Sequence, residues 1–178
     1  MTSRCKLAAP ALAALLVSGV LAQGTPPDDA QIAAIVVAAN QVDIDAGKVA
    51  ESKGHSKEVR AFGKLMVTDH SGVNKAATDL VHKLKVTPQD HPTAQSLKKG
   101  GDDNLARLRQ LSGAPFDKAY VDHEVTYHQA VLDAVDKTLV PNAKNEELKA
   151  LLVKVRPAFV VHLEHAKQLQ AQLGKTGG

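Results

Sequence analysis

Apolar residues recur at intervals of three and four along almost the whole chain after residue 29, which is the period of an amphipathic helix. No stretch shows the alternation, or the density of β-branched and aromatic residues, that strands need. Capping residues, glycines and prolines divide the pattern into segments at about 28–53, 56–86, 93–112, 115–139 and 145–173. Four of them are about 25–30 residues long, or about 40 Å. The sequence therefore predicts an all-α protein.

Short connections determine the predicted topology. The first two long helices are joined at Gly54 and the last two at Pro141–Asn142, each by about two residues, so each pair must form an antiparallel hairpin. Between the hairpins lies a shorter helix, 93–112, which we expect Gly100–Gly101 to break. This order predicts a ferritin-like four-helix bundle over residues 30–173, with a linker at 23–29 and a flexible tail at 174–178.

Each long helix carries ionisable side chains on its apolar, core-facing stripe at about mid-length. They are Asp43, His70, Glu124 with His128, and His162. Because an unpaired buried charge costs several kcal/mol, these groups should be paired, hydrogen-bonded or metal-bound. Counting from the predicted turns places Glu124 within about 6 Å of the level of His162, but places His128 about 12 Å from it.

Two interpretations of these residues remain open. As a metal site, Asp43, His70, Glu124, His128 and His162 would offer carboxylate and imidazole ligands suited to Zn, Cu, Fe or Ni, so a divalent metal ion is the candidate cofactor. As a structural network, they would hydrogen-bond to one another, with or without a buried water, and fix helix register. The sequence contains no Glu-x-x-His motif, two of which a ferritin-type di-iron site requires.

The first 22 residues have the layout of a secretory signal peptide. Arg4 and Lys6 precede an apolar run of about 16 residues, shorter than the roughly 20 that a membrane-spanning helix needs. The run ends in Val20-Leu21-Ala22, with small residues at the −3 and −1 positions of a cleavage site. We therefore expect cleavage near Ala22, export to the periplasm, and no transmembrane span in the mature chain.

Composition excludes several other functions. The chain has 178 residues, a formal net charge of +3, no Trp, two Tyr and three Phe, too little charge and too few aromatic rings for a nucleic-acid-binding surface. Its single cysteine, Cys5, is removed with the signal peptide, so no disulfide or cysteine-based zinc site is expected. No nucleophile-elbow motif or phosphate-binding glycine loop occurs, and we therefore do not expect an enzyme.

Three motifs together resemble one bacterial family. They are Met66-Val67-Thr68-Asp69-His70, then Phe116-Asp117-Lys118-Ala119-Tyr120 followed by His128, and then Pro157 followed by His162-Leu163. In order and spacing they resemble the exported, ferritin-like family of domain of unknown function 4142, whose members are often labelled outer membrane proteins. The resemblance covers about residues 30–173.

This resemblance implies a ferritin-like bundle exported to the periplasm or envelope, with no established reaction. It also implies that the family's characteristic polar positions are Asp69, His70, His128 and His162, with Asp43 at an acidic position of the first helix. A glycine, Gly63, stands where the family pattern usually has alanine, and we expect this difference to change little.

The leading hypothesis is therefore an exported, periplasmic helical-bundle protein that binds a ligand or associates with the envelope and contains a buried polar network. The alternative is a metal-binding bundle protein or metalloenzyme that uses the same five residues.

Overall fold

The computed structural model describes residues 25–176, and this part of the chain consists of helices joined by short turns, without a strand. The predicted all-α class is confirmed, whereas the predicted signal peptide lies outside the described residues. No described helix is both long and apolar enough to cross a membrane. The elements are α1 (Asp29–Lys53), α2 (Lys57–Leu84), α3 (Pro92–Gln110), α4 (Gly113–Ala134), the π-helical segment η1 (Val135–Leu139), α5 (Val140–Asn142) and α6 (Glu146–Thr176).

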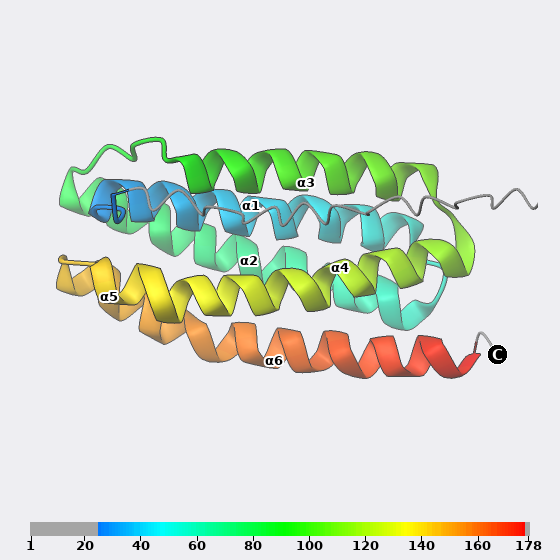
Figure 1. Ribbon diagram of the computed structural model, residues 1–178. Helices are drawn as coiled ribbons and strands as arrows, with labels where there is room; N and C mark the ends of the chain where they lie inside the picture. Colours follow the sequence, from blue (N-terminus) through cyan, green and yellow to red (C-terminus); the bar gives the residue numbers. More distant parts are fainter. Residues whose placement is uncertain (1–24, 177–178) are drawn as a thin grey trace, which may run out of the picture.

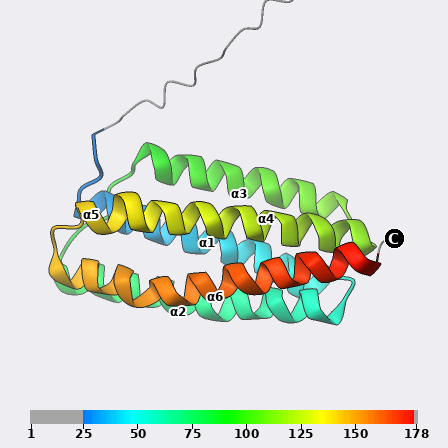
Figure 2. The same ribbon diagram turned by 60° about the horizontal axis from the view of Figure 1, so that its bottom comes forward.

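The long helices lie side by side along one direction and form a helical bundle (Figure 1). α1 and α2 make one hairpin, and α4 and α6 make the other, while α2 also packs against α6. The shorter helix α3 lies along α1 at the outside of the bundle (Figure 2). Because α6 continues to Thr176, residues 174–176 belong to a helix and not to the predicted tail.

Each hairpin contributes one aspartate that binds the backbone of the other hairpin's turn. The carboxylate of Asp117, on α4, accepts hydrogen bonds from the backbone N–H groups of residues 55 and 56 at 2.7 and 2.8 Å. The carboxylate of Asp29, at the start of α1, accepts from those of residues 144 and 145 at 2.9 and 3.0 Å. These bonds satisfy donors at the starts of α2 and α6 and fix the lengthwise register of the two hairpins.

The predicted break in the connecting helix is wrong, because α3 runs without interruption through Gly100–Gly101. Gly101 is buried against α1, where a Cβ atom would lie 2.8 Å from Cγ2 of Val42. A glycine in a helix costs about 1 kcal/mol relative to alanine. Here its missing side chain lets α3 approach α1 closely, so the glycine serves the packing of a continuous helix.

The predicted turn at Pro141–Asn142 is also wrong. Both residues are helical, and the turn to α6 follows them at residues 143–145. The segment η1 joins α4 to α5, with the N–H of Val140 bonded to the carbonyl of Val135 in the wider π pattern. Pro141 then stands in the first turn of α5, directly after the π-helical segment.

A glycine pair sets the distance between α1 and α2. A Cβ atom at position 63 would lie 2.7 Å from the carbonyl oxygen of Gly47 and 2.8 Å from the Cβ of Ala50. A Cβ at position 47 would in turn lie 2.7 Å from the carbonyl oxygen of Gly63. Glycine at position 63 therefore allows the close approach of α1 and α2, contrary to the expectation that this difference from the family pattern changes little.

The buried apolar residues form two main clusters, one toward each end of the bundle. One cluster takes α1 from Ala46 to Ala50, α2 from Val59 to Met66, α4 from Phe116 to Val121, and Ala166 and Leu169 of α6. The other takes the opposite portions of α1, α2 and α6, together with η1: residues 32–38, Ala77, residues 148–152 and residues 135–139. The polar residues predicted from the helical pattern lie between the two clusters on every long helix.

Candidate metal centre

All five residues predicted from the helical pattern come together in one buried layer. Each of them is at most 2% exposed to solvent. One potential ligand atom from each of His70, His128 and His162 lies within 4.8 Å of the other two, and the same holds for Asp43, Glu124 and His128. The five residues therefore form two adjoining groups that share His128.

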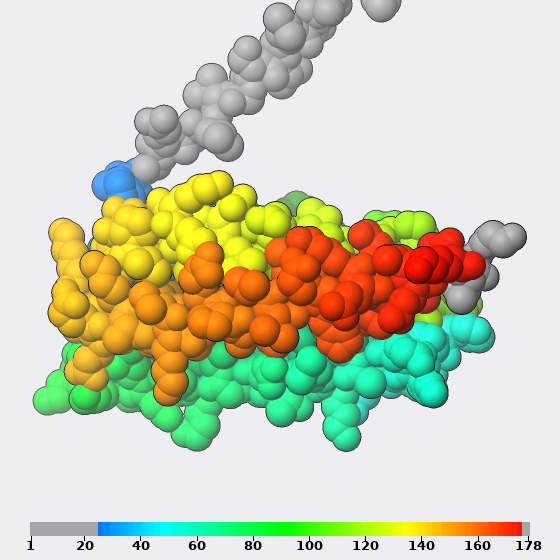
Figure 3. Space-filling view, turned by 90° about the horizontal axis from the view of Figure 1, so that it is seen from below, coloured from blue at the N-terminus to red at the C-terminus, as the bar shows by residue number. Residues whose placement is uncertain are grey.

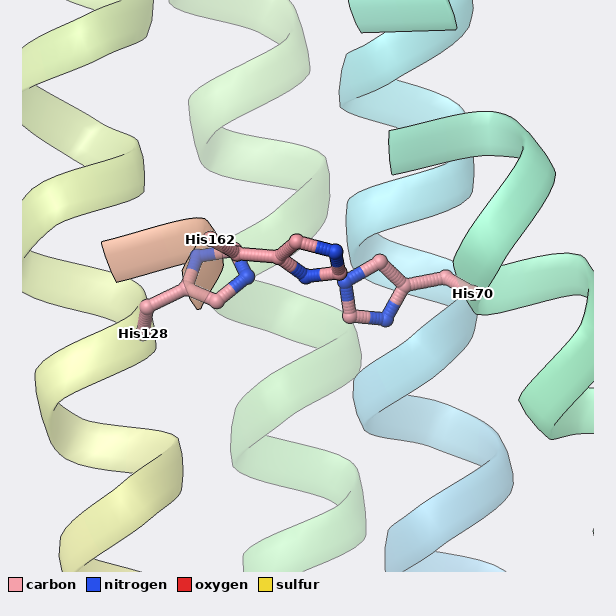
Figure 4. A group of neighbouring side chains, drawn as sticks. All are labelled: His70, His128 and His162. Atoms are coloured by element: carbon pink, nitrogen blue, oxygen red, sulfur yellow. The ribbon is translucent and has the colours of Figure 1, made fainter. Parts of the chain in front are cut away.

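The three histidines come from three neighbouring helices. α6 lies between α4 and α2 on one face of the bundle (Figure 3), and the imidazole rings of His128, His162 and His70 face one another inside it (Figure 4). Their ring centroids are 5.2–5.5 Å apart.

The prediction that His128 lies about 12 Å from the level of His162 is wrong. The turn comes later than predicted, so His128 lies about 14 residues before the end of α5, and His162 about 16 residues after the start of α6. The two therefore lie at nearly the same height in the bundle.

A buried amide fixes the tautomer of His70. Asn40, one turn before Asp43 on α1, donates from Nδ2 to the carbonyl oxygen of Val36 at 2.8 Å, which turns its Oδ1 toward His70. The Nδ1 of His70 lies 2.8 Å from this oxygen and 3.5 Å from Oδ2 of Asp43, so Nδ1 carries the proton. The Nε2 of His70 keeps its lone pair and has no partner among the described residues.

The other two histidines follow the same pattern. The Nε2 of His162 lies 2.9 Å from Oδ2 of Asp69, so Nε2 donates and Nδ1 keeps a lone pair. The Nδ1 of His128 lies 3.1 Å from the backbone oxygen of Glu124, which leaves Nε2. These two remaining nitrogens are also buried without a hydrogen-bond partner in the described part of the chain. A ring held at one nitrogen by a carboxylate or carbonyl, with the other nitrogen free, is the usual state of a metal-ligating histidine.

The pKa shifts differ between the three rings. Burial, together with the neighbouring His128 and His162, lowers the pKa of His70 to about 2, so its ring is neutral at pH 7. Burial also lowers the pKa of His162, although the hydrogen bond to Asp69 opposes this shift. Burial alone would lower the pKa of His128, but its bond to Glu124 and the charges of Asp43 and Glu124 raise it to about 9. Without an ion, His128 is thus the cationic partner of Glu124, whereas burial and the neighbouring Glu124 raise the pKa of Asp43 well above its ordinary value.

The chain matches one protein family. A model of the family described as domain of unknown function (DUF4142) matches residues 18–169. The chain belongs to this family. No curated protein and no solved structure matches it. The resemblance inferred from the motifs is therefore confirmed, and the DUF4142 description itself assigns no activity.

The donor set of this DUF4142 protein fits a transition-metal ion. Imidazole nitrogens, which are deprotonated when they bind a metal, suit Zn, Cu, Fe and Ni. Ligands about 2.0–2.1 Å from a tetrahedral ion lie about 3.3 Å apart, so nitrogens within 4.8 Å of one another need to move inward by at most about 1.5 Å. Rotation of side chains within a fixed backbone provides movements of this size.

Sequence reasoning missed two residues of the centre. Asn40 lies three residues before Asp43 and therefore on the same face of α1, which is the signal that identifies it in retrospect. Phe159 stacks on the ring of His70, with centroids 5.4 Å apart and planes 2° apart. Its place on the apolar stripe of α6 gave no indication of this contact.

A cavity of about 30 Å³ adjoins the centre. It is lined by Asn40, Asp43 and His70 on one side and by apolar residues of α1, α4, η1 and α6 on the other. This volume admits about one or two water-sized molecules. Any ligand that reaches the centre through it must therefore be very small.

Proposed function

We propose that this DUF4142 protein binds a transition-metal ion at His70, His128 and His162. The observation that carries the proposal is the set of three ring nitrogens that are buried and lack partners among the described residues, each belonging to a ring whose other nitrogen has an acceptor. Such an arrangement brings three ring nitrogens together at one place in the protein interior, and those of His70 and His162 carry lone pairs.

A purely structural network accounts less well for this arrangement. Leaving a buried polar atom unpaired costs about 1–3 kcal/mol, and a network that serves only to fix helix register would pair these nitrogens with one another or with nearby donors. A histidine ring in its neutral form has one donor nitrogen and one acceptor nitrogen. Here the donors of His70 and His162 point outward to Asn40 and Asp69, so the inner nitrogens of these two rings are both acceptors and cannot pair with each other.

The experiment is a metal titration of the purified protein with Zn²⁺, Cu²⁺, Fe²⁺ and Ni²⁺, with bound metal and melting temperature as readouts. An ion at about 100 times its dissociation constant stabilises a protein by about 2.7 kcal/mol, which raises the melting temperature by about 5–10 °C at this size. His70→Ala and His162→Ala should each remove this rise. His82→Ala is the matched control, because His82 lies on α2 but is exposed.

Two results would overturn the proposal. One is the absence of uptake of any of the four metals at micromolar concentration. The other is equal metal uptake by His70→Ala, His162→Ala, His82→Ala and the wild-type protein. An ion whose binding does not depend on His70 and His162 is bound elsewhere. In either case the buried residues would have a structural function only.

We further propose that the protein is exported to the periplasm, adopts a ferritin-like arrangement of its four long helices and acts by binding rather than catalysis. The signal-peptide pattern of residues 1–22 supports export. The two hairpins joined through α3 support the ferritin-like arrangement. A centre at most 2% exposed, beside a cavity of about 30 Å³, supports binding, because a larger substrate has no room there. Cell fractionation with N-terminal sequencing tests export, for which we expect a chain that begins near Gln23.

A further inference from the structure

The second group of the centre has the ligands of a harder cation. Asp43, Glu124 and His128 are 2%, 0% and 0% exposed, and one potential ligand atom from each lies within 4.8 Å of the other two. Three of their carboxylate oxygens, Oδ1 of Asp43 and both oxygens of Glu124, are buried without a hydrogen-bond partner in the described residues. Oxygen-rich ligand sets of this kind favour ions such as Mn²⁺, whereas imidazole also suits Fe²⁺ and Zn²⁺.

The charges within the layer demand a positive partner. Two carboxylates this close in the interior repel each other unless a cation or a proton lies with them. The Nδ1 of His128 lies 3.3 Å from Oε2 of Glu124, so this ring adjoins the carboxylate pair. A cation held by the two carboxylates and this ring would offset their repulsion.

We propose that Asp43, Glu124 and His128 form a second cation position, next to the three-histidine position and sharing His128 with it. This inference rests on the proposed function, because it adds a second ion to the first. His128 serves the two positions with its two nitrogens: Nε2 toward the other histidines and Nδ1 toward Glu124.

The two positions differ in chemistry and therefore in preferred metal. The first offers three nitrogens, which bind Zn²⁺ well. The second offers two carboxylates and one nitrogen, which bind Mn²⁺ or Fe²⁺ relatively better. The protein should therefore bind one Zn²⁺ and one Mn²⁺ when Zn²⁺ is limited to one equivalent and Mn²⁺ is in excess, because free Zn²⁺ binds more tightly than Mn²⁺ at most sites.

The test measures bound Zn²⁺ and Mn²⁺ by equilibrium dialysis and elemental analysis. The wild-type protein should bind about two ions in total. The isosteric double variant Asp43→Asn/Glu124→Gln should keep the three-histidine ion and lose at least 100-fold in Mn²⁺ affinity. The double variant Asp45→Asn/Glu51→Gln is the matched control, because it makes the same changes on exposed or half-buried carboxylates of α1 and should bind like wild type.

The outcomes separate this inference from the proposed function. One ion in the wild type, with Zn²⁺ and Mn²⁺ affinities unchanged in Asp43→Asn/Glu124→Gln, would overturn the second position and leave the first. A single ion would also overturn it if binding is abolished both by Asp43→Asn/Glu124→Gln and by His70→Ala or His162→Ala. That result would indicate one ion bound by both groups. No ion at all would overturn both proposals.

X-ray absorption spectroscopy of the wild-type protein loaded with both metals needs no variant and so does not depend on variant folding. We expect nitrogen neighbours around Zn²⁺ and mainly oxygen neighbours around Mn²⁺. Identical environments for the two metals would contradict the assignment.

Discussion

Replacing Gly63 by alanine should destabilise the protein, because a methyl group has no room between α1 and α2. The new Cβ would lie 2.7 Å from the carbonyl oxygen of Gly47 and 2.8 Å from both the Cβ of Ala50 and the backbone nitrogen of Glu51. Two of these three atoms belong to the α1 backbone, so no side chain can move aside to relieve the contact. The two helices must separate instead.

The magnitude follows from two opposing terms. Overpacking typically costs about 1–3 kcal/mol, and contact with backbone puts this site at the upper end, about 3 kcal/mol. Alanine gains about 1 kcal/mol over glycine from its helix propensity. The free energy of unfolding should therefore fall by about 2 kcal/mol in Gly63→Ala.

The same helix provides the matched control. At Gly72, also within α2, a Cβ atom would meet nothing within 4 Å. Gly72→Ala should therefore show the propensity term alone and raise the free energy of unfolding by about 1 kcal/mol. Equilibrium urea denaturation of the two variants measures both values. Stabilisation by Gly63→Ala similar to that by Gly72→Ala would refute the close contact of α1 and α2.

Three further predictions concern the aspartates and the histidines. Asp117→Asn should lower the free energy of unfolding by about 2–4 kcal/mol, because an amide replaces a carboxylate that accepts two backbone N–H bonds. The control Asp45→Asn, on the surface, should change the free energy of unfolding by less than about 0.5 kcal/mol in the same denaturation assay. Asp69→Asn should weaken metal binding about 10- to 100-fold, because the hydrogen bond that orients His162 is weakened. Competition with a chelator measures the affinity. A metal affinity equal to that of Asp45→Asn would contradict the orienting role of Asp69. In thermal melts of the ion-free protein, the melting temperature should fall as the pH rises from about 6.5 toward 9. The raised pKa of His128, about 9, gives a contribution that is lost over this range, and the raised pKa of Asp43 acts in the same direction. Below about pH 6.5 the lowered pKa of His70 gives a contribution that is lost as the pH falls, which the contribution of Asp43 opposes. A flat profile above pH 6.5 would count against the raised pKa of His128.

The helical period predicted the site better than counting along the helices did. The apolar stripes predict that Asp43, His70 and His162 face the core, because each of them interrupts a stripe. A stripe identifies the core-facing side of a helix to within a fraction of a turn. The height of a residue depends instead on where the turn lies. Pro141 is a strong turn signal, yet η1 and α5 carry the helix past it, and this shift of a few residues was enough to misplace His128.

The remaining errors concern contacts between helices that are distant in the sequence. Gly101 reads locally as a helix breaker, and only its contact with Val42 of α1 explains why the helix continues there. Gly47 and Gly63 are unremarkable in their own helices, and their importance appears when α1 and α2 are packed together. Local propensity does not contain such information, because the free energy that decides these positions comes from the partner helix.

The position of the polar layer between two apolar clusters explains how the fold tolerates it. On α1, α2, α4 and α6 alike, buried apolar residues lie both before and after the site residues, so two clusters stabilise the bundle on either side of the layer. The bonds from Asp117 and Asp29 to the turns hold each end in register independently of the centre. The apolar clusters also exclude water from the layer, which lowers the local dielectric constant and strengthens every interaction within it, repulsion between Asp43 and Glu124 included. A bundle stabilised at its ends can therefore keep at its centre a set of unpartnered polar atoms that would be too costly elsewhere, and under the proposed function a bound cation would turn that cost into affinity.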